Sequence, residues 1–375
     1  MKAFKKIAAL TCAAILSLSC LAGCGKTSYT ASNTEYFIGA TGPLTGDASS
    51  YGISVKNGAE LAVEEINANG GLNGVNFKFD IKDDKATAAD AATGYDSLYE
   101  AGMQISLGSV TSGSCESFAT KAAEDNLFFI TPSASAANVI ADRSNAFRIC
   151  FGDPDQGTLA AEQLVAKYSN IGAIYDSSDA YSYGIFEAFK AKMEELNVEF
   201  KTQSFDAENK KDFSTQAEAL KDCDVIFLPI YYTEASLIAK AVAAKGCSAA
   251  LFGCDGLDGL AELLDGTVPN TITYITPFDV NSTDPTVSSF VEAYRAKYGS
   301  DPDQFAADGY DAVKVIYEAM KKAGIDDVTI DPSTLCDKVV SVITDASFSY
   351  TGATGTMTWD ASGACTKPPQ IVVLQ

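Results

Sequence analysis

The sequence predicts an α/β protein in which parallel sheets are flanked by helices and divided between two lobes. Short apolar runs alternate with amphipathic helical patterns along the chain, which is typical of parallel sheets covered on both faces. A length of 375 residues is enough for about two domains. Hydrophobic residues make up 47% of the chain, so each domain can form a buried core.

The first strand–helix unit spans residues 36–74. Tyr36–Ala40 is a short apolar run that reads as a strand, and the Gly- and Pro-containing segment 42–47 reads as a turn. Apolar residues three or four positions apart then predict one face of a helix, which stops at the Asn- and Gly-rich segment 67–71. Open α/β sheets bind ligands in loops at the carboxyl ends of their strands, so this turn is a candidate for a site.

The same alternation continues to the end of the chain. Further strands are expected at 76–81, 104–107, 127–130, 171–175, 198–203, 225–228, 249–252 and 271–275. Helices are expected at 158–168, 184–196, 234–245, 285–298 and 304–323. The tail at 355–363 reads as a strand and a tight turn, and we expect Trp359 to pack in a core rather than stack on a ligand.

Composition limits the function classes. The net charge of −22 argues against binding to nucleic acid and against broad contact with anionic lipid. The chain has no histidine, which excludes Ser–His–Asp and Cys–His catalysis and histidine-based metal sites. Carboxylates, lysines and cysteines could still act, so an enzyme is disfavoured. We expect no metal and no cofactor.

Residues 1–23 have the pattern of a leader. Basic Lys2, Lys5 and Lys6 precede an apolar run that is short for a membrane span. The run ends in Leu-Ala-Gly-Cys at 21–24, which resembles a bacterial lipobox. The resemblance implies a diacylglycerol anchor on Cys24, cleavage before that residue and a short lipidated tether at 24–34. The alternative is an ordinary secretory leader that happens to contain a cysteine.

Seven cysteines remain beyond Cys24, and the odd number leaves at least one free thiol in the monomer that we expect. None belongs to a C-x-x-C pair, so zinc is not expected. Most are expected to be small core residues. Cys223 and Cys247 each precede a predicted strand, so a disulfide between them is geometrically conceivable.

Several motifs in order resemble the amino-acid-binding proteins of bacterial ABC importers, in particular the leucine/isoleucine/valine-binding branch. The opening TGPLTGDASSYGISVKNGAELAVEEINANGGLNG (41–74) resembles the start of that family most strongly. The likeness continues through DDKATAADAA, GSVTSGSCESFA, FFITPSASA, FRICFGDPDQG, DSSDAYSYG and LFGCDGLDG. Each motif is weak alone, but together they follow the family order along nearly the whole mature chain.

The resemblance implies the type I periplasmic binding fold, with two Rossmann-like lobes joined by three chain crossings. The crossings are expected near 151–154, near Pro277 and near 350–355. The first lobe would then comprise 35–152 plus 278–350, and the second 153–277 plus 351–375. Three parallel segments form a hinge that bends but resists independent tumbling.

A free amino acid needs donors for its carboxylate and an acceptor for its ammonium group, and helix N-termini supply donors without an arginine. By the family pattern, Ser112 and Ser135 give hydroxyl and amide donors to the carboxylate, and Ser133 gives its carbonyl to the ammonium. Ala134 belongs to the same loop and is assigned to the site. The alternative is ordinary helix N-capping by serine and threonine.

The second lobe is expected to supply Tyr181, Tyr231 and Asp255, each after a predicted strand. The family tyrosine lies three residues before a glycine, which selects Tyr181 over Tyr183, whereas Tyr232 could replace Tyr231. Asp255 takes the position of the family carboxylate that holds the ligand ammonium. Tyr51 matches the family residue that lines the side-chain pocket.

The resemblance therefore implies an extracytoplasmic lipoprotein that binds an amino acid, most simply Leu, Ile or Val, and delivers it to a membrane permease. Related importers for other amino acids or amides share this frame, and a sensory domain of the same fold is a second class. A Rossmann-type enzyme is a third, but Gly39, Gly42 and Gly46 form neither G-x-G-x-x-G nor a Lys-bearing P-loop.

Overall fold

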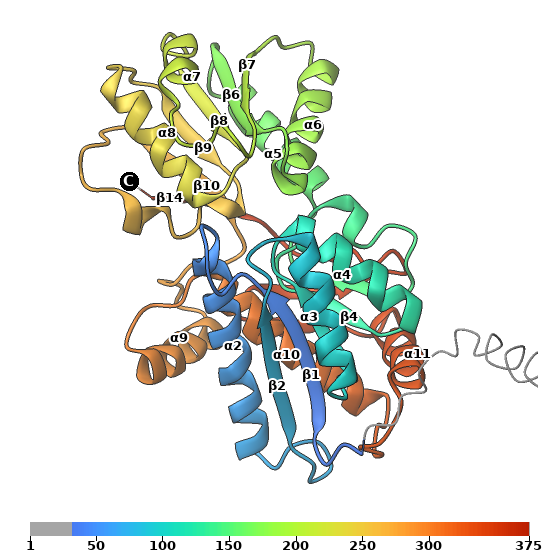
Figure 1. The fold of residues 1–375 in the computed structure, drawn as a ribbon. Coiled ribbons are helices and arrows are strands. Elements are labelled where there is room, and N and C mark those ends of the chain that lie inside the picture. The colour runs from blue at the N-terminus through green and yellow to red at the C-terminus, as the bar shows by residue number, and fades with distance from the viewer. Residues whose placement is uncertain (1–31, 375) are drawn as a thin grey trace, which may run out of the picture.

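The computed structural model describes residues 32–374, which form two α/β lobes (Figure 1). The first lobe has a parallel sheet in the order β2-β1-β3-β4-β5. The second has the order β14-β10-β9-β8-β6-β7, with β14 antiparallel to its neighbour. The bounds are β1 Tyr36–Gly42, β2 Phe77–Asp83, β3 Ile105–Ser109, β4 Phe129–Thr131, β5 Ala146–Arg148, β6 Ile171–Asp176, β7 Lys201–Phe205, β8 Val225–Leu228, β9 Ala250–Gly253, β10 Ile272–Thr276 and β14 Gln370–Val373. The predicted class, parallel sheets flanked by helices, is confirmed.

Helices cover both faces of the first sheet. Alternate residues of β1 face opposite sides, so Ile38 packs in the core with α2, α10 and α11, whereas Phe37 packs with α3 and α4. The helices are α2 Ser49–Ala68, α3 Ala88–Glu100, α4 Ser112–Asp125, α9 Pro285–Tyr298, α10 Gln304–Lys322 and α11 Pro332–Ile343, with a 3-10 turn η1 at Ala137–Val139. A Cβ on Gly58 would lie 1.9 Å from the carbonyl oxygen of Ala306, so α2 and α10 pack closely because this residue is glycine.

The second lobe has two apolar cores. One contains Ile226 and Leu251 with α7 and α8, and the other contains Phe227 and Phe252 with α5 and α6. The helices are α5 Asp153–Val165, α6 Ala180–Glu195, α7 Ser214–Ala219 and α8 Tyr232–Ala244, with 3-10 turns η2 at Asp255–Leu257 and η3 at Leu260–Leu263. The parallel strands of this sheet, β6 to β10, end beside the first lobe, so the loops that follow them face it (Figure 1).

The third chain crossing lies later than expected. We expected residues 351–375 in the second lobe, but β12 (Gly355–Trp359) places Met357 and Trp359 in the core of the first. These are the inward-facing alternate residues of the strand, so that core is where their apolar surface is buried. β12 pairs with β11 (Tyr350–Gly352) and β13 (Cys365–Thr366), and only β14 joins the second sheet. The proposed boundary therefore moves to residues 367–369.

The expected leader at 1–23, the lipidation site Cys24 and most of the tether lie outside the described residues. Within residues 32–374, no helix combines the length and apolarity needed to span a membrane. The seven cysteines of this range are free thiols, and all but Cys365 are buried. Cys223 and Cys247 are thus not joined by a disulfide in this structure.

Candidate ligand-binding site

Strand ends and helix starts from both lobes meet at one small cavity. Its lining comprises Tyr51, Val110, Thr111, Ser112, Ser133, Tyr181, Tyr231, Asp255, Gly256 and Phe305. Six of the eight residues predicted for the site are in this lining, and the other two, Ala134 and Ser135, are buried in the same loop as Ser133. The site lies where open α/β sheets bind ligands, beyond the carboxyl ends of β3, β4, β8 and β9.

Ser112 is the hydroxyl best placed to donate into the cavity. Its Oγ accepts hydrogen bonds from the backbone N–H groups of Ser135 and Ala136, at 3.2 and 3.1 Å. Because both lone pairs of the oxygen are engaged, the hydroxyl hydrogen is what remains for a ligand. Ser112 is also the first residue of α4, where the unpaired N–H groups of the first turn favour an anion.

The alternative interpretation was that the serine and threonine hydroxyls of these loops cap helices, and the geometry at α4 differs from it. The N-cap residue of α4 is Thr111, whose side chain makes no cap hydrogen bond. Its Oγ1 is buried and has no hydrogen-bond partner among residues 32–374. Buried hydroxyl groups are normally hydrogen-bonded, so this one is available to a ligand or a water molecule.

Ser133 and Ser135 are placed differently from the simplest expectation. The Ser133 hydroxyl donates to the carbonyl of Val110 at 2.7 Å, which fixes the loop. The Ser135 amide, expected to donate to the ligand, instead donates to Ser112, because the loop turns its backbone toward α4. What Ser135 retains is a buried hydroxyl without a hydrogen-bond partner in the described chain.

Asp255 supplies a buried carboxylate on the opposite wall. It is 4% exposed, and its Oδ1 accepts a hydrogen bond from the Tyr181 hydroxyl at 2.7 Å. Burial raises the pKa of Asp255 to about 6, although the hydrogen bond from the Tyr181 hydroxyl opposes the shift. Its side chain caps no helix in the structure, because the N-cap residue of η2 is Cys254. A buried carboxylate needs a cationic partner, which a ligand ammonium would provide.

The predicted tyrosines form the aromatic part of the lining. The rings of Tyr181 and Tyr231 stack with centroids 4.9 Å apart. Tyr183, the rejected alternative, is 47% exposed on the outside of the lobe. Tyr232 is buried against Tyr51 and donates its backbone N–H to the Tyr51 hydroxyl at 3.1 Å. Tyr231, and not Tyr232, therefore lines the cavity.

Tyr51 joins the two lobes directly. Its hydroxyl donates to the carbonyl of Gly256 at 2.6 Å, and its ring lies 4.2 Å from that of Phe305, centroid to centroid. The cavity between these side chains has a volume of only about 10 Å³, room for one water molecule. Binding an amino acid therefore requires the stacked tyrosines, or the lobes themselves, to move apart.

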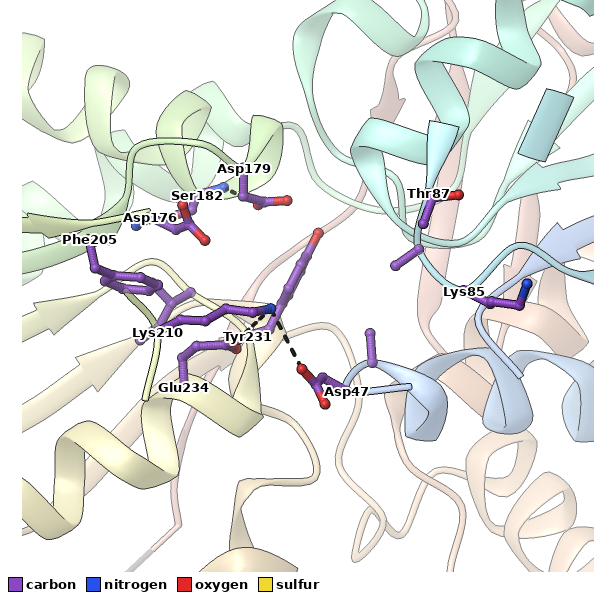
Figure 2. A pocket seen from close by; sticks show the side chains of 13 residues that line it. Asp47, Lys85, Thr87, Asp176, Asp179, Ser182, Phe205, Lys210, Tyr231 and Glu234 are labelled. Atoms are coloured by element: carbon purple, nitrogen blue, oxygen red, sulfur yellow. Dashed lines mark hydrogen bonds and ion pairs between the residues drawn. The ribbon is translucent and has the colours of Figure 1, made fainter. Parts of the chain in front are cut away.

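A larger polar chamber lies beside this cavity at the mouth of the cleft (Figure 2). Its volume is about 300 Å³, and Tyr231 lines both spaces. The charged and hydroxyl groups around it are Asp47, Lys85, Thr87, Asp176, Asp179, Ser182, Lys210 and Glu234. Figure 2 shows the Tyr231 hydroxyl pointing between Asp179 of the second lobe and Thr87 of the first.

An ion-pair bridge crosses the chamber. Lys210 Nζ lies 3.2 Å from Glu234 Oε1 in its own lobe and 3.6 Å from Asp47 Oδ2 in the other (Figure 2). Thr233 adds a hydrogen bond from its hydroxyl to the Asp47 carbonyl at 2.8 Å. Asp47 of the first lobe is thus held by two residues of the second lobe.

The contributors to the site that were not predicted include two glutamines and a phenylalanine. Gln156 accepts the backbone N–H of Asp255 at 3.1 Å, Gln304 donates to its carbonyl at 2.9 Å, and Phe305 closes the cavity. Both glutamines are almost fully buried. Gln156 lies in the motif FRICFGDPDQG, and Gln304 begins a strongly amphipathic helix, but neither signal separates a site residue from an ordinary first-turn residue.

Comparison with known proteins identifies the family of this chain. The family model described as periplasmic binding protein matches residues 35–366. The Leu/Ile/Val-binding protein BraC3 of Rhizobium johnstonii is 28% identical over 296 residues, covering 78% of this chain and 80% of the relative. The chain therefore belongs to the periplasmic binding protein family, which comprises extracytoplasmic solute-binding proteins rather than enzymes.

Several solved structures of solute-binding proteins are similar to this chain. The leucine-binding protein LivK of Thermotoga maritima has a TM-score of 0.80 and 26% identity, with 90% of this chain and 95% of that chain covered. LivJ of Streptococcus pneumoniae, solved with isoleucine, has a TM-score of 0.76 and 25% identity, covering 90% and 99%. A solute-binding protein of R. palustris, solved with benzoate, has a TM-score of 0.81 and 20% identity, with 91% of this chain and 93% of that chain covered, which shows the fold alone. The type I periplasmic binding fold is confirmed, and binding proteins of branched-chain amino-acid ABC transporters are among the structures most similar to the chain.

Proposed function

We propose that this chain is the extracytoplasmic binding component of an ABC importer for an amino acid, with leucine, isoleucine or valine as the expected ligands. The ligand is held between the lobes and delivered to a membrane permease. A lipid on Cys24 keeps the monomeric protein at the membrane surface. Tyr51, Ser112, Ser133, Ala134, Ser135, Tyr181, Tyr231 and Asp255 make up the proposed site.

One observation carries the proposal: a buried carboxylate on one lobe faces hydroxyl and amide donors on the other. Asp255 supplies the acceptor for an ammonium group, and Ser112 with the start of α4 supplies donors for a carboxylate. An α-amino acid carries both groups on one carbon. The names of the relatives and of the most similar structures support the branched-chain assignment.

A thermal-shift screen of the purified protein against the twenty common amino acids tests this proposal. A ligand at 100 times its dissociation constant adds about 2.7 kcal/mol to the free energy of unfolding. Leucine, isoleucine and valine should raise Tm most, and calorimetric titration should then give one site per chain. The proposal is wrong if no amino acid raises Tm while benzoate or a fatty acid does.

A second candidate is an amino acid or amide with a polar side chain. The chamber beside Tyr231 favours it, because four carboxylates and two lysines surround a space larger than the inner cavity. An aliphatic side chain placed there would leave these groups without hydrogen-bonding partners from the ligand. The same screen decides between the two, since a polar amino acid would then give the largest shift.

A further inference from the structure

Two glutamines, one from each lobe, form hydrogen bonds with the peptide groups of Asp255. Gln156 of α5 accepts the backbone N–H of Asp255 at 3.1 Å, within the second lobe. Gln304 of the first lobe donates its side-chain amide N–H to the Asp255 carbonyl at 2.9 Å. With Tyr181 on the carboxylate, Asp255 is fixed at its amide, its carbonyl and its side chain.

Gln304 is the part of this arrangement that belongs to the other lobe. It is the first residue of α10, is 1% exposed and contacts the second lobe at three points. Besides Asp255, its side-chain oxygen accepts the Thr276 hydroxyl at 2.7 Å, and its backbone N–H donates to Asp258 Oδ2 at 2.8 Å. Every polar group of its side chain and its amide therefore faces a second-lobe partner.

We propose that Gln304 is a positioning residue that links closure of the lobes to capture of the ligand's ammonium group by Asp255. The proposal rests on the proposed function, because it takes Asp255 as the ammonium acceptor. When α10 docks on the loop at 255–258, the Asp255 carbonyl gains its partner and the carboxylate is held toward Tyr181. When the lobes separate, that carbonyl loses the Gln304 hydrogen bond.

The chemistry of the position explains why an amide is present. The side chain must donate to one carbonyl and accept from one hydroxyl without carrying charge. A glutamate would add a negative charge beside Asp255, Asp258 and Asp303, whose pKa values burial already raises. A methionine has a similar length but can neither donate this hydrogen bond nor accept more than weakly.

The test compares Gln304→Met with the wild-type protein, using leucine and its des-amino analogue 4-methylpentanoate as probes in calorimetric titration. Loss of a buried hydrogen bond to Asp255 should weaken leucine binding by about tenfold. Because 4-methylpentanoate has no ammonium group, its affinity should change by less than about threefold. Gln163→Met, the same substitution at an exposed position of α5, is the matched control and should change neither affinity.

A purely structural role predicts a different result. If Gln304→Met weakens both probes equally, or neither, the link to the ammonium group is wrong. Hydrogen exchange of the ligand-free protein gives a readout that does not depend on the ligand. Exchange in the peptide covering 251–259 should rise by roughly tenfold in Gln304→Met and not in Gln163→Met. An unchanged exchange rate overturns the proposal even if leucine is not the ligand, whereas leucine failing to bind the wild type rejects only the branched-chain assignment.

Discussion

The carboxylates of Asp258 and Asp303 approach the N-terminus of α10 from opposite lobes. Asp303 caps the helix by accepting the Ala306 N–H at 2.8 Å, and Asp258 accepts the Gln304 N–H at 2.8 Å. Asp303 also accepts the Ser54 hydroxyl at 2.6 Å, and Asp258 accepts the Tyr274 hydroxyl at 3.4 Å. The amides at the N-terminus of α10 favour the ionised form of both carboxylates, whereas burial and their mutual repulsion favour the protonated form.

The first prediction follows from this pair. Burial, then the charge of Asp258, raises the pKa of Asp303 to about 7, with Glu262 adding to the repulsion. An unfolded aspartate has a pKa of about 3.9, so between about pH 4 and 7 the folded protein binds more protons than the unfolded chain. The contribution of this group to stability is therefore present at low pH and lost as pH rises through 7. Tm should be higher at pH 5 than at pH 8.

Thermal melts from pH 5 to pH 8 test whether Asp303 causes this pH dependence of Tm. Asp303→Asn should flatten the pH dependence, because the neutral amide keeps the cap acceptor without the charge. Asp331→Asn is the matched control, since Asp331 also caps a helix but its hydrogen bonds lower its pKa. The control should keep the slope of the wild type. Equal slopes in all three proteins would contradict the role of Asp303.

The sequence was a good guide to elements with long apolar runs and a poor one to short or edge strands. β1, at 36–42, was predicted at 36–40 because its whole length is buried. β5 has only three residues, which is too short to show a periodic pattern. It is defined instead by its pairing with β4, in which Ala146 is the partner of Phe129. β7 was expected at 198–203 but lies at 201–205, because an edge strand with exposed residues is defined by its register on β6.

The site was predictable where a residue type signals its chemistry and follows a strand. Ser112, Tyr181 and Asp255 meet that condition, and the structure brings them to one cavity. Gln304 does not, because its role depends on how the two lobes meet, and the sequence does not encode that contact locally. The Ser135 amide was assigned to the ligand, but its partner depends on the turn of the loop.

The second prediction concerns the bridge across the chamber. Asp47→Asn removes the charge that Lys210 meets in the first lobe but keeps the carbonyl that accepts the Thr233 hydroxyl. Exposed ion pairs contribute about 0–1 kcal/mol, so ligand affinity should fall by no more than about fivefold, with faster dissociation. The effect should shrink as salt is raised. Asp80→Asn, which breaks an exposed pair within the first lobe, should leave binding kinetics unchanged, and an equal effect there would contradict an interlobe role.

The third prediction concerns the proposed anchor. The wild-type protein should partition with membranes and carry the mass of a diacylglycerol, because Cys24 follows Leu-Ala-Gly in the lipobox pattern. Cys24→Ala should abolish both properties. Cys20→Ala, four residues earlier in the same leader, should retain both. Cell fractionation with mass spectrometry checks this, and a soluble, unmodified wild-type protein would reject the anchor.

The fourth prediction is a pH dependence of binding. Because burial raises the pKa of Asp255 to about 6, the carboxylate is increasingly protonated below that pH. An ammonium group pairs with the charged form of Asp255, so the affinity should be constant above about pH 7. Well below pH 6, the affinity should fall by close to tenfold for each pH unit. Calorimetric titration from pH 5 to pH 8 measures it. Affinity that rises as pH falls would contradict ammonium capture by this residue.

The last prediction is that Asp255→Ala weakens binding of the amino acid by about one hundredfold or more. Removing one member of a buried charge pair costs about 3–5 kcal/mol, at 1.4 kcal/mol per tenfold. Asp255→Asn should be less severe, because it keeps one acceptor but loses the charge. Folding should survive both changes, since no helix depends on this side chain for a cap. Calorimetric titration beside melting curves separates the effects: near-wild-type affinity with a lowered Tm would show that Asp255 stabilises the fold and does not hold the ligand.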